Sequence, residues 1–138
     1  MKKLLLVLVM ATFFLGCDKE NFNNRNPYIP NYGFDIAINT NLPSYSQLQF
    51  PSNAIYYPGE GALGIIIFNT GSGYNAFDAA CPNQQISSCS TMSIDGINAV
   101  CACDDAEYSL FTGLAPNQEY PLKAYRVEVN GTVIRVSN

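Results

Sequence analysis

Short segments in which apolar and polar residues alternate recur along most of the chain and predict β-strands. Over residues 34–39, Phe34, Ile36 and Ile38 alternate with Asp, Ala and Asn, so one face of the expected strand is apolar. Residues 64–68 (GIIIF) are instead apolar throughout, which predicts a strand buried on both faces. We find no clear helical period in the sequence. The pattern therefore predicts an all-β domain.

Turn signals separate the predicted strands at close intervals. Strands are expected over 54–57 and 74–78, and the second leads directly to a cysteine. Asp95-Gly96 and Asn130-Gly131 each lie between alternating segments, a pattern that favours a type I′ hairpin turn with positive φ at both central residues. With no internal repeat, these signals predict one small β-sandwich or barrel of about eight to ten strands.

The first residues have the organisation of a secretory signal. Two lysines precede residues 4–15, which are apolar except for one threonine. This run is shorter than the about 20 residues of a membrane span and matches the hydrophobic region of a signal peptide. It ends in FLGC, which resembles the bacterial lipobox, whose cysteine is lipidated and becomes the first mature residue. We expect a signal peptide over 1–16, a lipidated Cys17 and a tether over 17–33; a signal peptide with a chance cysteine is the alternative.

Lipidation of Cys17 would hold the mature chain on a membrane outside the cytoplasm. Each buried methylene contributes about 0.8 kcal/mol, so the acyl chains of a bacterial lipoprotein exceed what stable anchoring needs. The polar tract that follows, residues 18–26, cannot bury enough apolar surface to fold and suits a tether. The sequence thus predicts that the acylated Cys17 binds the lipid bilayer. The expected location is the cell envelope, on the periplasmic or the outward face of the outer membrane.

The charge balance and the lack of histidine exclude several classes of function. Two of the seven basic residues lie in the predicted signal, so five remain against eleven acidic ones, a net charge of about −6. An acidic domain without a cluster of Lys or Arg is not expected to bind nucleic acid. Without histidine the chain cannot form Ser-His or Cys-His pairs, and we do not expect an enzyme. The acidic residues at 104–107 fit a solvated turn better than a Ca²⁺ site, and Tyr56-Tyr57 fits core positions better than a ligand groove.

Four cysteines follow Cys17 in the sequence: Cys81, Cys89, Cys101 and Cys103. An even number in an oxidising compartment predicts two disulfides, with three possible connectivities. A Cys101–Cys103 bond is the least favourable pairing, because only one residue lies between its partners. Four thiolates also suit Zn²⁺, although the spacings Cys-x7-Cys and Cys-x-Cys lack the Cys-x2-Cys of structural zinc sites. A zinc-stabilised domain is therefore the alternative to disulfides.

Two cysteine-bearing segments resemble the ligand boxes of Rieske iron–sulfur domains. Residues 76–83 (AFDAACPN) are similar to the first box and residues 100–104 (VCACD) to the second, and YSLFTG at 108–113 follows as in that family. The tail at 120–127 (YPLKAYRV) is similar to the closing strands of Rieske ferredoxins. With its lipobox, the chain resembles Rieske-fold lipoproteins of the Bacteroidetes type. The resemblance implies a Rieske-like β domain over 34–138 with two cysteine-bearing loops.

The resemblance also implies which positions would hold a cluster. The family pattern is Cys-x-His followed by Cys-x2-His, and the two imidazoles raise the potential of the cluster. Cys81 and Cys101 match the ligand cysteines, whereas Asn83 and Asp104 stand where the histidines would be. A neutral amide is a poor iron ligand and a carboxylate is a hard one, so we expect no cofactor. The alternative is a [2Fe–2S] electron carrier or another metal site that uses Cys81, Cys101 and Asp104.

The resemblance further implies how the cysteines pair. In Rieske proteins that carry a disulfide, the bond joins the two cluster loops; Cys103 matches its second-box member, and Cys89 lies near its first-box member. Without iron between them, Cys81 and Cys101 would pair with each other, and Cys89 with Cys103. The expected function is that of an envelope lipoprotein with a cluster-free Rieske-like domain in a binding or structural role. Its partner would be an envelope protein or ligand that the sequence does not identify.

Overall fold

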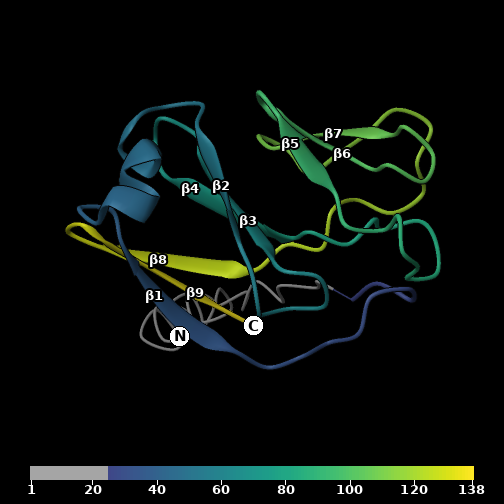
Figure 1. Cartoon of the computed structure of the whole chain (residues 1–138), viewed down its shortest axis with the longest axis horizontal. Helices are drawn as coiled ribbons and strands as arrows, with labels where there is room; N and C mark the ends of the chain where they lie inside the picture. Colours follow the sequence, from purple (N-terminus) through teal and green to yellow (C-terminus); the bar gives the residue numbers. More distant parts are fainter. Residues whose placement is uncertain (1–24) are drawn as a thin grey trace, which may run out of the picture.

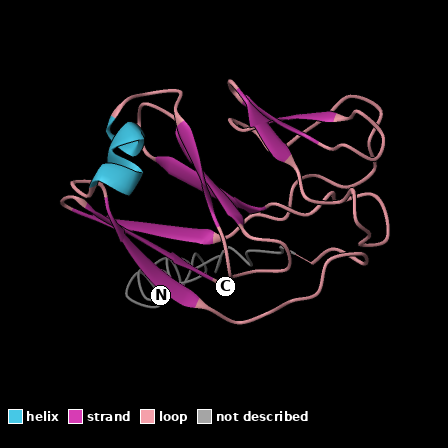
Figure 2. Ribbon diagram, viewed as in Figure 1, coloured by secondary structure: helices cyan, strands magenta, loops and turns pink. Residues whose placement is uncertain are grey.

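The computed structural model describes residues 25–138, which form short β-strands and one short helix (Figures 1 and 2). The predicted signal peptide, Cys17 and the first part of the predicted tether lie outside the described residues. Within 25–138, no helix has the length and apolar character needed to cross a membrane. The elements in chain order are β1 (Asp35–Asn39), the 3₁₀ helix η2 (Pro43–Gln49), β2 (Ala54–Tyr57), β3 (Ile65–Asn69), β4 (Tyr74–Asp78), β5 (Ser93–Asp95), β6 (Asn98–Val100), β7 (Glu107–Ser109), β8 (Arg126–Asn130) and β9 (Val133–Ser137).

The strands form three antiparallel sheets of three strands each. The sheet orders are β1-β9-β8, β2-β3-β4 and β5-β6-β7. Figure 1 shows the β5-β6-β7 sheet set apart from the β1-β9-β8 sheet, with β2, β3 and β4 between them. The predicted all-β class is confirmed for the described residues, and their nine strands fall within the expected number.

β3 is buried on both faces, as its unbroken apolar sequence predicts. Ile65, Ile66, Ile67 and Phe68 all have 0% exposure. Alternate side chains of a strand point to opposite faces, so Ile66 and Phe68 pack in one apolar cluster, while Ile65 and Ile67 pack in another. The first cluster includes residues of β6 and β7 and two of the cysteines, and the second includes residues of β1 and β9. The domain therefore has two cores that share one strand.

The sequence pattern failed to predict η2. This helix is seven residues long and begins at a proline, a residue that suits the first position of a helix. Leu48 is its only buried side chain, so the helix has no apolar stripe from which a period could be detected. The absence of a helical pattern was thus a correct observation that led to the wrong expectation for residues 43–49.

The predicted type of the two hairpin turns is also wrong. Asp95 pairs with Asn98 in the β5–β6 ladder, so the loop residues are Gly96 and Ile97 rather than Asp95 and Gly96. Gly96 has a φ of 57°, whereas Ile97 is not among the residues with positive φ. The turn after Asn130 is built in the same way, with its glycine first. Positive φ at the first central residue alone is the pattern of a type II′ turn, not type I′.

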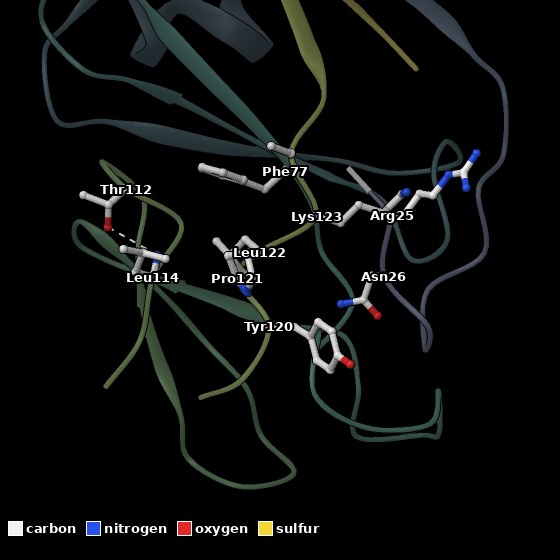
Figure 3. A pocket seen from close by; sticks show the side chains of 10 residues that line it. Arg25, Asn26, Phe77, Thr112, Leu114, Tyr120, Pro121, Leu122 and Lys123 are labelled. Carbon is white, nitrogen blue, oxygen red and sulfur yellow. Dashed lines mark hydrogen bonds between the residues drawn. The ribbon is translucent and has the colours of Figure 1, made fainter. Parts of the chain in front are cut away.

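The described part of the predicted tether lies against the domain. Asn26 Nδ2 donates a hydrogen bond of 2.8 Å to the Pro82 carbonyl oxygen, and Tyr28 meets Tyr120 edge-to-face with ring centroids 5.9 Å apart. Ile29 is buried, with 3% exposure. Asn26 and Tyr120 also line a pocket of about 260 Å³ (Figure 3). This N-terminal segment therefore packs beside the first cysteine-bearing loop and the stretch that precedes β8.

Candidate functional site

Two loops carry the four cysteines, and main-chain hydrogen bonds close each loop at its base. The first loop connects β4 to β5, and in it the Cys81 N–H donates to the Ser90 carbonyl oxygen at 2.8 Å. The second loop connects β6 to β7, and there the Cys101 N–H donates to the Ala106 carbonyl oxygen at 3.0 Å. These bonds fix where each cysteine lies relative to the sheets. The two cysteine-bearing loops that the family resemblance implies are therefore both present.

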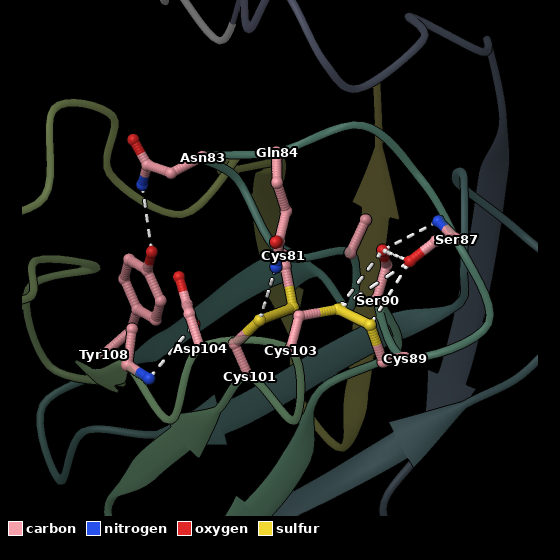
Figure 4. Close-up of a disulfide and its surroundings, with 12 residues drawn as sticks. Cys81, Asn83, Gln84, Ser87, Cys89, Ser90, Cys101, Cys103, Asp104 and Tyr108 are labelled. Carbon is pink, nitrogen blue, oxygen red and sulfur yellow. Dashed lines mark hydrogen bonds between the residues drawn. A yellow bond between two sulfur atoms is a disulfide. The ribbon is translucent and has the colours of Figure 1, made fainter.

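The structure joins the two loops by two disulfides (Figure 4). Cys81 is bonded to Cys101, with 5.6 Å between their Cα atoms, and Cys89 is bonded to Cys103, with 5.2 Å. This connectivity is the one that the family resemblance implied. The first disulfide is buried, with exposures of 1% and 0%, whereas Cys89 is exposed and Cys103 is half-buried. One bond thus belongs to the core and the other to the surface.

Asn83, which stands where the family has a histidine, uses its whole side-chain amide in hydrogen bonds. Its Nδ2 donates to the Tyr120 carbonyl oxygen at 2.8 Å and to the Tyr108 hydroxyl at 2.9 Å. Its Oδ1 accepts the Tyr120 N–H at 2.8 Å. The amide therefore pairs with the main chain of Tyr120 much as a neighbouring strand would. Asn83 holds the first loop against the stretch before β8.

Asp104, at the other histidine position, is exposed and caps its own turn. Its Oδ1 accepts the Ala106 N–H at 3.1 Å. Burial raises the pKa of the nearby Tyr108, the hydrogen bond with Asn83 partly offsets this rise, and the charge of Asp104 adds to it. The solvated acidic turn expected at 104–107 ends before Glu107, because Glu107 begins β7.

The chemistry of this donor set does not fit an iron–sulfur cluster or a zinc ion. Within residues 25–138, the side chains that could converge on one metal are Cys81, Cys101 and Cys103, whose sulfurs lie within 4.8 Å of one another. Each of these sulfurs is already bonded to another sulfur, and a disulfide sulfur is not a thiolate ligand. Asp104 is not part of that group. The Asn83 amide is committed to protein partners.

Three polar side chains that the sequence reasoning did not single out surround the sulfurs (Figure 4). Gln84 Nε2 donates to Cys101 Sγ at 3.0 Å. The Ser87 hydroxyl lies 3.2 Å from Cys89 Sγ, and the Ser90 hydroxyl lies 3.8 Å from Cys103 Sγ. A disulfide sulfur carries no proton, so the hydroxyls are the donors in these contacts. Serines on both sides of Cys89 in the sequence were the available signal for this environment.

A second polar cluster, also missed by the sequence reasoning, lies in the core. Asp78 has 0% exposure, and its carboxylate accepts the Tyr125 hydroxyl at 2.6 Å. Burial and this hydrogen bond raise the pKa of Tyr125. Lys123 is also buried and donates to Asn31 Oδ1 at 2.9 Å. Burial lowers the pKa of Lys123, and the negative charge of Asp78 opposes part of that shift.

Comparisons with known proteins bear on the fold. No protein-family model matches the chain, and no curated protein matches it in sequence. A chain from the complex of reduced oxygenase and oxidized ferredoxin in carbazole 1,9a-dioxygenase matches with a TM-score of 0.50 and 19% identity, over 76% of this chain and 92% of that one. The ferredoxin of carbazole 1,9a-dioxygenase from Nocardioides aromaticivorans IC177 matches with a TM-score of 0.48 and 17% identity, over 77% of this chain and 97% of that one. The Sphingomonas yanoikuyae B1 ferredoxin matches with a TM-score of 0.46 and 18% identity, over 67% of this chain and 93% of that one. At these identities the likeness concerns the fold alone, and that fold is Rieske-like.

Proposed function

We propose that the protein is a lipid-anchored component of the cell envelope whose Rieske-like domain works without a cluster, as a binding or structural module. The observation that carries this proposal is the bond between Cys81 and Cys101. These cysteines stand at the two positions that would supply thiolates to a cluster, and in the disulfide neither sulfur is a ligand. The proposal therefore treats the two loops as a covalently closed surface.

The bonds within and around the loops support a binding role. Two disulfides join the loops to each other, and the Asn83 amide joins the first of them to Tyr120. Loops fixed in this way lose little conformational freedom when a partner docks, which favours affinity. Ile86, on the first loop, is an apolar side chain with 39% exposure. A protein or ligand of the envelope is the partner that this surface would meet.

The proposed anchor rests on the first residues of the sequence. The apolar run that ends in FLGC supports cleavage before Cys17 and acylation of its sulfur and amino group. The polar tract at 18–24 supplies a tether between the anchor and the described domain. The lipid bilayer is thus the first partner of the protein, and the outer membrane, on its periplasmic or outward face, is the proposed location.

A second candidate function is favoured by the Rieske-like fold itself. If all four cysteines were thiols, Cys81 and Cys101 would again be available to an iron–sulfur cluster in an electron-transfer protein. A zinc-stabilised domain that uses the four thiolates is the corresponding alternative without redox chemistry. Both alternatives require thiols where the leading proposal requires disulfides.

One measurement separates these functions. The Cys17→Ala chain, exported through its own signal, would be analysed by intact mass without reductant and by elemental analysis. We expect a denatured mass four hydrogens below that of the fully reduced chain, as two disulfides require, with neither iron nor zinc bound. A chain with four free thiols and bound iron would contradict the leading proposal and support electron transfer, and zinc in place of iron would support the structural metal site.

Restoring the missing ligands tests the same proposal from the other side. The double variant Asn83→His/Asp104→His supplies both imidazoles of the family pattern. We expect it to remain colourless after oxidative export, because Cys81 and Cys101 stay bonded to each other. An iron–sulfur absorption spectrum from this variant would show that the disulfide does not prevent cluster assembly.

The anchor needs its own experiment. Radiolabelled palmitate should be incorporated into the wild-type chain and not into Cys17→Ala. Cys89→Ala is a matched control, since it also removes one cysteine but leaves the proposed lipidation site. Palmitate incorporation into Cys17→Ala equal to that into the wild type would contradict lipidation at Cys17.

A further inference from the structure

We propose that the two disulfides form one thiol–disulfide exchange site, in which Cys103 passes electrons from a dithiol at the surface to the buried Cys81–Cys101 bond. The observation that carries this proposal is the clustering of three sulfurs. Cys103 Sγ lies within 4.8 Å of both Cys81 Sγ and Cys101 Sγ, yet it is bonded to the sulfur of Cys89 instead. The inference goes beyond the binding role proposed above and does not depend on the identity of a partner.

The surface disulfide offers an entry point for an external thiol. Cys89 is exposed, whereas Cys81 and Cys101 are buried. Thiol–disulfide exchange needs a thiolate to reach a disulfide sulfur, so an external dithiol reaches Cys89 first. The partner is identified by this chemistry as a dithiol, either a small molecule or a protein with a reduced cysteine pair.

Hydrogen-bond donors lie beside the sulfur that leaves in the first step. Attack of the dithiol on Cys89 Sγ breaks the Cys89–Cys103 bond and releases Cys103 as a thiolate. The hydroxyls of Ser87 and Ser90 both lie 3.8 Å from Cys103 Sγ. Hydrogen bonds to a charged group favour its charged form, and a better-stabilised thiolate leaves faster. The second thiol of the reductant then attacks the mixed disulfide that joins the reductant to Cys89. Cys89 leaves as a thiolate, and the reductant becomes an intramolecular disulfide.

The second step transfers the bond into the core. The Cys103 thiolate attacks Cys81 Sγ, a Cys81–Cys103 bond forms, the Cys81–Cys101 bond breaks, and Cys101 leaves as a thiolate. Two electrons and two protons have then passed from the dithiol to the protein, which holds one disulfide and two thiols, at Cys89 and Cys101. The oxidised dithiol is the other product, so atoms and electrons balance.

Two features select Cys81 as the sulfur that Cys103 attacks. Attack on Cys101 would close a bond between residues separated by Ala102 alone, which is an unfavourable small ring. Attack on Cys81 instead expels Cys101, whose sulfur already accepts a hydrogen bond of 3.0 Å from Gln84 Nε2. The Gln84 amide is therefore placed to stabilise the thiolate that leaves.

A matched pair of variants tests the role of Cys103. Cys89→Ser and Cys103→Ser remove the same surface disulfide, so they lose the same loop constraint, but only Cys89→Ser keeps the Cys103 sulfur. Each full-length chain would be treated with limiting dithiothreitol in detergent, quenched with iodoacetamide at intervals, and mapped by peptide fragmentation. We expect the Cys81–Cys101 bond to open about tenfold or more faster in Cys89→Ser. Equal rates in the two variants would overturn the proposal.

The wild-type chain supplies a second readout that does not depend on either variant folding. With less than one equivalent of dithiothreitol, label should appear on Cys101 together with Cys89, while near-ultraviolet circular dichroism still reports the folded domain. In Gln84→Leu, the Cys101 label should appear about tenfold more slowly, with labelling of Cys89 unchanged. Label confined to Cys89 and Cys103 in the folded wild-type chain would show that the surface disulfide opens without passing electrons inward, and would overturn the proposal.

Discussion

The phenolic O–H of Tyr125 donates a hydrogen bond of 2.6 Å to the carboxylate of Asp78, and both side chains are almost wholly buried. The same carboxylate accepts the N–H of Ala62 at 2.6 Å and the N–H of Ala80 at 2.8 Å. Asp78 ends β4, whereas Tyr125 immediately precedes β8. A buried carboxylate is tolerated only where protein donors replace its water. One side chain therefore joins the start of the first cysteine loop to the closing hairpin.

Replacing this carboxylate should cost far more than replacing an exposed one. Asp78→Ala leaves the buried Tyr125 hydroxyl and three buried or part-buried N–H groups without their acceptor, and we expect a loss of about 3 kcal/mol or more in the free energy of unfolding. Urea unfolding without reductant would measure it. Asp35→Ala is the control, because Asp35 forms an exposed ion pair with Arg135 and such pairs contribute little. Similar losses for the two variants would contradict a structural role for Asp78.

The raised pKa of Tyr125 makes a prediction about alkaline stability. Burial and the hydrogen bond to Asp78 raise this pKa above its ordinary value of 10.0, so the folded state holds the proton more tightly than the unfolded state. The resulting stabilisation is fully present below pH 10 and is lost as the pH rises further, because the unfolded tyrosine ionises first. The stability difference between the wild type and Tyr125→Phe should therefore be constant from pH 7 to 9. It should then fall by up to about 1.4 kcal/mol per pH unit above pH 10; a difference that stays constant to pH 11.5 would contradict the raised pKa.

Two glycines with the same backbone conformation should differ in their tolerance of a methyl group. Gly59 has a φ of 95° and Gly64 a φ of 96°, so alanine strains both backbones by a similar amount. A Cβ at Gly64 would lie 2.4 Å from the Tyr56 ring, whereas a Cβ at Gly59 meets nothing within 4 Å. We expect thermal unfolding to show Gly64→Ala less stable than Gly59→Ala by about 1–3 kcal/mol. Adding Tyr56→Ala should remove most of that difference, and its persistence would assign the cost elsewhere.

The two disulfides should stabilise the domain unequally. They close loops of similar length, with sequence separations of 20 and 14, so the chain-entropy contribution is about 3 kcal/mol for each. The Cys81–Cys101 bond also fills part of the core, and its removal leaves a cavity. The pair Cys81→Ala/Cys101→Ala should therefore cost roughly 1–2 kcal/mol more than Cys89→Ala/Cys103→Ala in guanidinium unfolding. Equal costs would show that the buried sulfurs contribute no packing.

The Asn83 amide should be required for its shape and its polarity together. Asn83→Ala removes two donated bonds and one accepted bond, and we expect a loss of about 1–3 kcal/mol. Asn83→Asp is the matched control: it keeps the shape and the acceptor but places a carboxylate against the Tyr120 carbonyl oxygen. Urea unfolding should find Asn83→Asp close to Asn83→Ala in cost. An aspartate variant as stable as the wild type would mean that the donated bonds do not matter.

Features set by neighbouring residues could be predicted from the sequence, and features set by distant partners could not. The strand over 64–68 was predicted because five consecutive apolar residues indicate burial on both faces. The predicted type of the hairpin turn was wrong because Asp95 pairs with Asn98 in the ladder, which places the glycine at the first loop position. Lys123 illustrates the second limit, since a lysine is normally exposed, whereas this one is buried and donates a hydrogen bond to Asn31, 92 residues away in sequence.

In the candidate site, too, features set by neighbouring residues could be predicted, and features set by distant partners could not. The family resemblance located both cysteine loops and implied which cysteines pair, because ligand boxes are local motifs. It placed Asn83 only as a missing histidine, since its real partner, the main chain of Tyr120, lies 37 residues away. The clustering of Cys103 with the buried disulfide could not be predicted, because it depends on how the two loops pack together in space.

The contact between Asn26 and Pro82 determines how tension would pass through the molecule. A pull on the chain upstream of residue 25 reaches this hydrogen bond, one residue from Cys81, before it reaches β1. This link is a single hydrogen bond, and the covalent route from residue 26 to Cys81 runs through β1 to β4, so a sustained pull strains the hydrogen bond before it loads the sheets. The N-terminal segment would then peel away from the first cysteine loop, while the two disulfides keep that loop closed.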